Sequence, residues 1–178
     1  ADGFNDYFTL LNERDGGIGG QKVLTPECET AYNTEKGVEC YESLKGQNQL
    51  VVAPLSTGIT YQLIPKVSAD KVTLYTPGLG RTSSKNGAAF EWVFNAPANY
   101  WDGASVAIKY LLDQNGGSLE GKKIALLYHN SAYGKGLADE TKKSLNAKGQ
   151  KEAMYEAITA GEKDYSALIS KMKQAGIE

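Results

Sequence analysis

Histidine and cysteine are scarce in this chain of 178 residues, which holds one histidine, His129, and two cysteines, Cys28 and Cys40. Zinc sites and many acid–base or thiol mechanisms draw on these residue types. The sequence therefore predicts no metal site and no cofactor. A lone histidine at the end of a strand is more typical of a structural role than of a catalytic one.

Catalytic motifs are also missing. The sequence contains neither a Gly-x-Ser-x-Gly elbow nor a phosphate-binding P-loop. The acidic residues are scattered over expected helix surfaces, where solvation is their ordinary role. We therefore predict no catalytic residue and expect that the chain is not an enzyme.

Long apolar runs and charge of one sign are absent as well. No apolar run approaches the roughly 20 residues that a helix needs to cross a bilayer. No basic-then-apolar signal peptide is present, although a mature secreted protein has already lost this segment. The net charge is -2 with both signs interspersed, so nucleic acid is not an expected partner.

The residues that are present favour a globular α/β fold. Hydrophobic residues make up 41% of the chain and charged residues 22%. Apolar spacing alternates between helical and strand periods, which predicts a mostly parallel sheet with helices on both faces. The expected helices cover residues 4–11, 34–44, a segment after 58 that Pro65 kinks or restarts, 104–111, 133–148 and 165–172. The expected strands cover residues 22–25, 49–53, 72–76, 92–95, 123–129 and 151–157.

The two ends of the pattern are unusual for such a fold. The chain opens on a helix, and residues 176–178 stand where another strand is expected. We therefore expect a fragment that is incomplete at both ends. A missing central strand would leave sheet edges unpaired, so we also expect the chain alone to be poorly stable or to associate.

Three loops follow expected strands, and ligands in open α/β sheets bind at the carboxyl ends of strands. The first loop contains Leu55, Ser56 and Thr57. Two hydroxyls at a helix start favour an anion such as a carboxylate, because backbone amides and the helix dipole point outward there. The alternative is plain helix capping by Ser56 or Thr57.

The other two loops have similar alternatives. Gly78 and Gly80 would let the backbone approach a ligand closely, or they form an ordinary turn. Tyr133 opens a predicted helix, where its ring can stack on a ligand or pack on its own helix. Spacing alone also leaves the cysteines open, as a disulfide or as two separate buried thiols.

Several segments carry a family resemblance. Residues 158–168 (ITAGEKDYSAL) closely resemble the leucine/isoleucine/valine-binding proteins of bacterial ABC importers, which have the type I periplasmic binding fold. Residues 133–138 (YGKGLA) and 12–20 (NERDGGIGG) fit the same family. Residues 30–41 and the pair Tyr100-Trp101 look more like a sister branch of amino-acid-type receptors.

This resemblance implies two α/β lobes that close on a ligand like a clamp. The first lobe would cover residues 1–95 without its first strand, a hinge crossing would cover 96–99, and part of the second lobe would cover 100–178. The implied function is transport: a periplasmic solute-binding protein that delivers an amino acid, or a related small carboxylate, to an ABC permease. The same fold also serves extracellular ligand-sensing domains of receptors and regulators, which is the alternative function.

The resemblance also assigns site residues. Leu55, Ser56 and Thr57 match the loop that binds the amino-acid carboxylate. Gly78 and Gly80 match positions that contact the ammonium group and backbone of the ligand, and Tyr133 matches a tyrosine that reaches the ligand from the second lobe. The predicted ligand residues are therefore Leu55, Ser56, Thr57, Gly78, Gly80 and Tyr133.

The sequence departs from the branched-chain pattern in three ways. Gly80 stands where a hydroxyl residue is usual, so one polar contact to the ammonium group is missing. Ser56 replaces the loop cysteine, which implies that Cys28 pairs with Cys40 instead. The second-lobe acid that holds the ammonium group is expected beyond Glu178.

Overall fold

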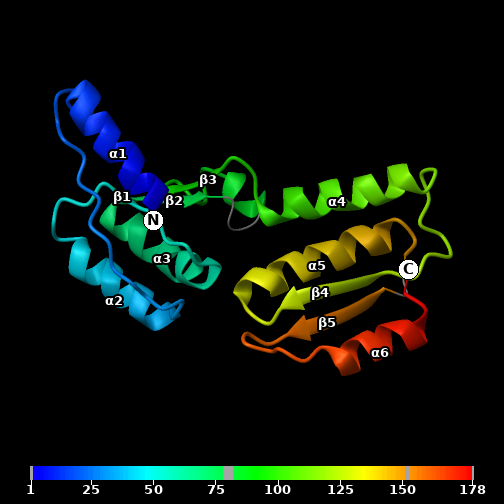
Figure 1. The fold of residues 1–178 in the computed structure, drawn as a ribbon. Coiled ribbons are helices and arrows are strands. Elements are labelled where there is room, and N and C mark those ends of the chain that lie inside the picture. The colour runs from blue at the N-terminus through cyan, green and yellow to red at the C-terminus, as the bar shows by residue number, and fades with distance from the viewer. Residues whose placement is uncertain (1, 78–81, 151–152, 178) are drawn as a thin grey trace. The chain divides into compact units, whose positions relative to one another are not determined.

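A computed structural model describes residues 2–77, 82–150 and 153–177 (Figure 1). The chain divides into two compact units, residues 1–31 and residues 32–178. The lobe and hinge boundaries expected from the resemblance, at residues 95 and 99, stay a prediction.

The first unit contains α1 (Asp2–Asp15) and a glycine-rich turn. Gly17 has a φ of 89°, and a Cβ there would come 1.9 Å from the carbonyl oxygen of Gln21, so only glycine fits. The strand predicted over residues 22–25 is wrong. The side chain of Asn12 instead bonds both the N–H and the C=O of Val23, each at 2.8 Å, and so takes the hydrogen bonds that a neighbouring strand would supply.

The second unit opens with three parallel strands and two helices. The sheet has the order β1 (Val51–Val52), β2 (Thr73–Pro77) and β3 (Val93–Ala96). The helices α2 (Thr34–Leu44) and α3 (Thr57–Asp70) lie side by side (Figure 1). Asn33 starts α2 by accepting the N–H of Lys36 at 2.8 Å. A 3-10 turn, η1 (Thr82–Lys85), precedes β3.

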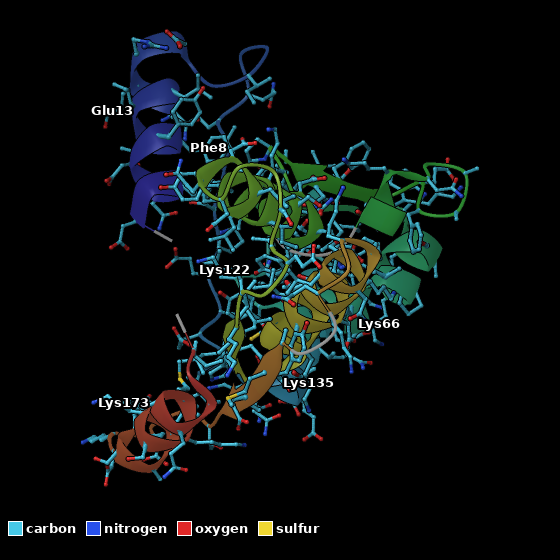
Figure 2. The ribbon with its side chains drawn as sticks, turned by 90° about the vertical axis from the view of Figure 1, so that its right-hand side faces the viewer. Phe8, Glu13, Lys66, Lys122, Lys135 and Lys173 are labelled. Atoms are coloured by element: carbon cyan, nitrogen blue, oxygen red, sulfur yellow. The ribbon has the colours of Figure 1, made fainter. Side chains whose placement is uncertain are left out.

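A hydrophobic core joins these elements. Apolar side chains of α3 recur at a spacing of four and pack against the sheet and against Tyr41 of α2; the buried set is Tyr41, Ile59, Leu63, Val67, Val72, Leu74 and Val93. Gly37 lets α2 approach closely, because a Cβ there would lie 2.5 Å from Ile59. Glu42 bonds Lys66 at 2.7 Å across the two helices, and Figure 2 labels Lys66 on α3.

The rest of the second unit holds a smaller parallel sheet. Its strands are β4 (Ala125–His129) and β5 (Met154–Ile158), with Ala125 opposite Met154. The helices α5 (Ala132–Ala147) and α6 (Ser166–Ala175) flank these strands, and α4 (Tyr100–Gln114) lies beside α5 (Figure 1). A cavity of about 380 Å³ with mainly apolar walls lies between α4, β4 and α5.

The structure confirms the α/β class and corrects some element bounds. The first strand of the sheet is only Val51–Val52, shorter than the predicted 49–53. Helix α3 continues through Pro65 instead of restarting there. The predicted helix 34–44 matches α2, and β4, α5, β5 and α6 all follow the predicted order. No helix of the described residues is both long and apolar enough to span a bilayer.

Candidate functional site

The first predicted ligand loop forms the start of α3. Ser56 is the N-cap, and its Oγ accepts the N–H of Ile59 at 3.3 Å. The first intrahelical backbone bond runs from Thr60 N to Ser56 O at 2.9 Å. The amides of Thr57 and Gly58 precede that bond, so they belong to the donors that a helix leaves for an outside partner. The helix dipole adds partial positive charge at the same place.

Two of the three predicted ligand residues in this loop are buried. Ser56 is 3% exposed and Thr57 only 1%, whereas the Leu55 side chain is 61% exposed. The capping interpretation of Ser56 is therefore correct as far as its side chain is concerned. Capping by Ser56 satisfies the Ile59 amide and does not involve the amides of Thr57 and Gly58.

Tyr100 covers the Thr57 hydroxyl. Thr57 Oγ1 donates to the Tyr100 hydroxyl at 3.5 Å. Tyr100 is the first residue of α4, and a capping box holds that helix start in place: Asn99 Oδ1 accepts the amides of Trp101 and Asp102, while the Asp102 carboxylate accepts the Asn99 amide at 3.1 Å. The position of Tyr100 is thus fixed by its own helix.

Tyr133 lies against Tyr100. The two ring centroids are 4.9 Å apart and the ring planes are inclined by 58°. Burial raises the pKa of Tyr100 above its usual value, and the nearby hydroxyls of Tyr133, Tyr32 and Tyr61 add to this effect, while the bond from Thr57 opposes it. The structure therefore brings Thr57 and Tyr133, two of the predicted ligand residues, around Tyr100.

The second predicted loop lies outside the described residues, since Gly78 and Gly80 fall in the range 78–81. The strands on either side are described. Thr76 of β2 pairs in register with Asn95 of β3, at the carboxyl end of the sheet. Both polar atoms of the Asn95 amide are buried and have no hydrogen-bond partner among the described residues. Sequence reasoning missed Asn95, because its only signal was a polar residue inside a short strand.

The third loop is shaped by close packing. His129 ends β4, and its Nδ1 lies 2.8 Å from Ser131 Oγ, so the lone histidine is held by its neighbour at the helix start. Gly134 lies directly over the same strand end, where a Cβ would come 2.0 Å from the carbonyl oxygen of His129. This close approach brings the first turn of α5, which includes Tyr133, against the end of β4.

Both cysteines are disulfide-bonded, and the described residues contain no free thiol. This state agrees with the disulfide alternative of the sequence and not with two separate thiols. It is also what the implied pairing of Cys28 with Cys40 requires, in a chain that has only these two cysteines.

The candidate site thus combines a helix start, a buried hydroxyl and two contacting tyrosine rings after the carboxyl ends of parallel strands. A family model described as "Periplasmic binding protein" matches residues 1–178, which is the whole chain. The chain belongs to the periplasmic binding protein family. The resemblance to leucine/isoleucine/valine-binding proteins is thereby confirmed at the level of the family, and the family is one of solute-binding proteins and not of enzymes.

Curated relatives of this periplasmic binding protein chain support the family assignment. Leu/Ile/Val-binding protein homolog 3 of Brucella melitensis is 33% identical over 165 residues, which is 92% of this chain and 43% of the relative. Leu/Ile/Val-binding protein BraC3 of Rhizobium johnstonii is 31% identical, covering 98% of this chain and 47% of the relative. The chain therefore spans less than half the length of these relatives.

Solved structures confirm the type I periplasmic binding fold. The structure of an ABC transporter permease from the Pseudomonas fluorescens group has a TM-score of 0.78 and 34% identity, over 97% of this chain and 43% of that one. A branched-chain amino acid ABC transporter protein of Thermus thermophilus with bound valine has a TM-score of 0.80 and 18% identity, over 97% and 44%. The second likeness shows the fold alone.

Proposed function

We propose that this chain forms part of an extracytoplasmic solute-binding protein of an ABC importer. Its ligand is an amino acid, branched-chain-like, or a related small carboxylate, and its partner is the membrane permease. The observation that carries the proposal is the start of α3, where the amides of Thr57 and Gly58 stand before the first intrahelical bond. The family membership and the Leu/Ile/Val-binding relatives support it.

The proposed carboxylate seat uses backbone more than side chains. The ligand carboxylate accepts the α3 amides beside Leu55, in the partial positive charge of the helix dipole. Ser56 acts from within, because its hydroxyl caps the helix and fixes the direction of those amides. The Thr57 hydroxyl donates to the Tyr100 hydroxyl at 3.5 Å. It can bond the ligand carboxylate only when Tyr100 moves away or when both acceptors share its hydrogen.

The other predicted residues complete the site in this proposal. Gly78 and Gly80 contact the ammonium group and backbone of the ligand, and Tyr133 covers the ligand from α5. Ligand binding stabilises the closed arrangement of two lobes by its higher affinity for that state. The Thr57–Tyr100 bond, which joins α3 to α4 across the predicted hinge, is one contact that such closure would change.

Calorimetric titration of the full-length gene product with the twenty amino acids and a set of small aliphatic and aryl carboxylates tests the function. We expect saturable binding of at least one of them with one site per chain. Ser56→Ala is expected to weaken that binding and to cost about 1 kcal/mol of stability, since it removes the α3 cap. The absence of binding by every amino acid and carboxylate in the set would overturn the proposal.

A further inference from the structure

Four tyrosines from four different segments meet beside the α3 start. Tyr100 of α4 and Tyr133 of α5 are in ring contact, with centroids 4.9 Å apart. Tyr32 precedes α2 and Tyr61 lies in α3, and both are near enough to Tyr100 to act on its hydroxyl electrostatically. The chain positions of these residues span a hundred residues, so the fold and not local sequence brings them together.

The tyrosine rings differ in their surroundings and in how far they are exposed. The Tyr61 hydroxyl lies close to α5, 3.9 Å from the place where a Cβ on Gly136 would stand. Tyr133 is 39% exposed, which leaves part of its ring surface open to a ligand. Tyr100 is half-buried between Tyr133 and Thr57.

The four tyrosines lie outside the buried sets of the two hydrophobic cores. The core of the first sheet contains one buried tyrosine, Tyr41, and otherwise aliphatic side chains. The buried core beside α4 and α5 consists of Ile108, Leu119 and Leu145. Among the described residues, neither buried set includes Tyr32, Tyr61, Tyr100 or Tyr133, although Tyr100 also borders the apolar cavity between α4, β4 and α5.

We propose that Tyr100, together with Tyr133, determines which side group the site accepts, and that the preferred ligand is a small carboxylate carrying an aromatic ring. This inference rests on the proposed function, because it uses the α3 start as the carboxylate seat. The distance of 3.5 Å between the Tyr100 hydroxyl and Thr57 Oγ1 puts the tyrosine wall directly next to that seat. A ligand with its carboxylate on α3 therefore presents its side group to Tyr100 and Tyr133.

The geometry of the wall favours an aromatic group over a branched aliphatic one. Two rings inclined by 58° offer the edge of one and the face of the other. A third ring can meet them in offset or edge-to-face contact, and each such pair adds attraction beyond the area that it buries. An aliphatic side group gains only the burial of its area.

The test compares four probes on the full-length gene product by calorimetric titration: L-phenylalanine, benzoate, L-leucine and L-valine. We expect one of the aromatic probes to bind at least tenfold more tightly than both aliphatic ones. Tyr100→Leu is expected to weaken the aromatic probe about tenfold, the upper end of what one aromatic pair contributes, and to leave leucine within about threefold. Tyr100→Phe keeps the ring and is expected to retain the preference for the aromatic probe.

Tyr110→Leu is the matched control, because Tyr110 lies on the same helix, is 62% exposed and is absent from the tyrosine cluster. It should leave all four affinities unchanged. Tyr133→Leu is the second variant if Tyr100→Leu does not fold. Tighter binding of leucine or valine than of either aromatic probe, or equal effects of Tyr100→Leu and Tyr110→Leu, would overturn this inference alone. Failure of all four probes and of the wider carboxylate set would overturn the proposed function as well.

Discussion

Gly134 lies where the first turn of α5 meets the end of β4. A Cβ on this residue would stand 2.0 Å from the carbonyl oxygen and 2.7 Å from the amide nitrogen of His129. Those atoms belong to the backbone, which cannot rotate aside as a flexible side chain can. The missing side chain of Gly134 therefore permits the close strand–helix packing that holds Tyr133 in the site.

Gly134→Ala is expected to lower the free energy of unfolding by about 2 kcal/mol or more, because the added methyl group overpacks the contact. Urea unfolding followed by circular dichroism measures this change. Gly136→Ala is the control on the same helix: its Cβ would meet only the Tyr61 hydroxyl, at 3.9 Å. That variant should be neutral or gain up to about 1 kcal/mol from helix propensity. Equal effects of the two substitutions would contradict the packing argument.

Asn95 gives a second prediction at this scale. Its amide nitrogen and oxygen are both buried and unpaired among the described residues, and such a group costs about 1–3 kcal/mol. Asn95→Val is therefore expected to raise the free energy of unfolding by about 1 kcal/mol, since valine also suits a strand. Asn12→Val is the contrast, because that amide makes two 2.8 Å bonds to Val23, and it should lose stability. A loss of stability in both variants would show that the Asn95 amide is satisfied.

At the scale of elements, the start of α4 depends on a carboxylate. The Asn99 amide holds the pKa of Asp102 below its usual range, and Lys85, 3.3 Å away, adds to the effect. A lowered folded-state pKa means that the carboxylate stabilises the fold above the ordinary pKa of aspartate. That contribution is lost as the pH falls through the lowered value.

In Asp102→Asn, the free energy of unfolding is accordingly expected to fall less steeply as the pH drops from about 5 to about 3. The difference should stay below about 1 kcal/mol, because the carboxylate is 34% exposed and solvent screens it. Thermal melts across this pH range measure it. Asp113→Asn is the matched control, because it removes an exposed carboxylate, 2.7 Å from Lys109, from the same helix without touching the capping box. If Asp102→Asn lost stability in acid as steeply as the original chain does, the role of the capping box would be contradicted.

Sequence patterns predicted the elements well where the chain carries its own signal. Helix α2 begins and ends at the predicted residues, since Asn33 caps it and its apolar residues recur at helical spacing. The predicted strand 22–25 failed because the decisive contacts come from Asn12, eleven positions away, and no local pattern reveals them. Helix α3 passes through Pro65 because Leu63 and Val67 on either side pack in the core, and tertiary packing outweighs the lost backbone bond.

At the scale of the whole molecule, the candidate site joins segments that no local pattern connects. The resemblance predicted Ser56, Thr57 and Tyr133, but it gave no reason for Tyr100 to cover Thr57. That contact spans 43 positions and requires the start of α4 to come against the start of α3. In the sequence, Tyr100 and Trp101 stand near the predicted hinge, where they could line an aromatic-walled pocket or pack in a core, and neither interpretation predicts a contact with Thr57.

The most direct test of the account concerns the carboxylate seat on α3. L-phenylalanine and L-leucine are each titrated against the full-length gene product and compared with their carboxamides, which keep the side group and the ammonium group. Charged hydrogen bonds and the helix dipole together predict that the carboxamide of the tighter-binding amino acid binds about a hundredfold more weakly. A carboxamide that binds as tightly as its amino acid would contradict a carboxylate seat at Thr57 and Gly58.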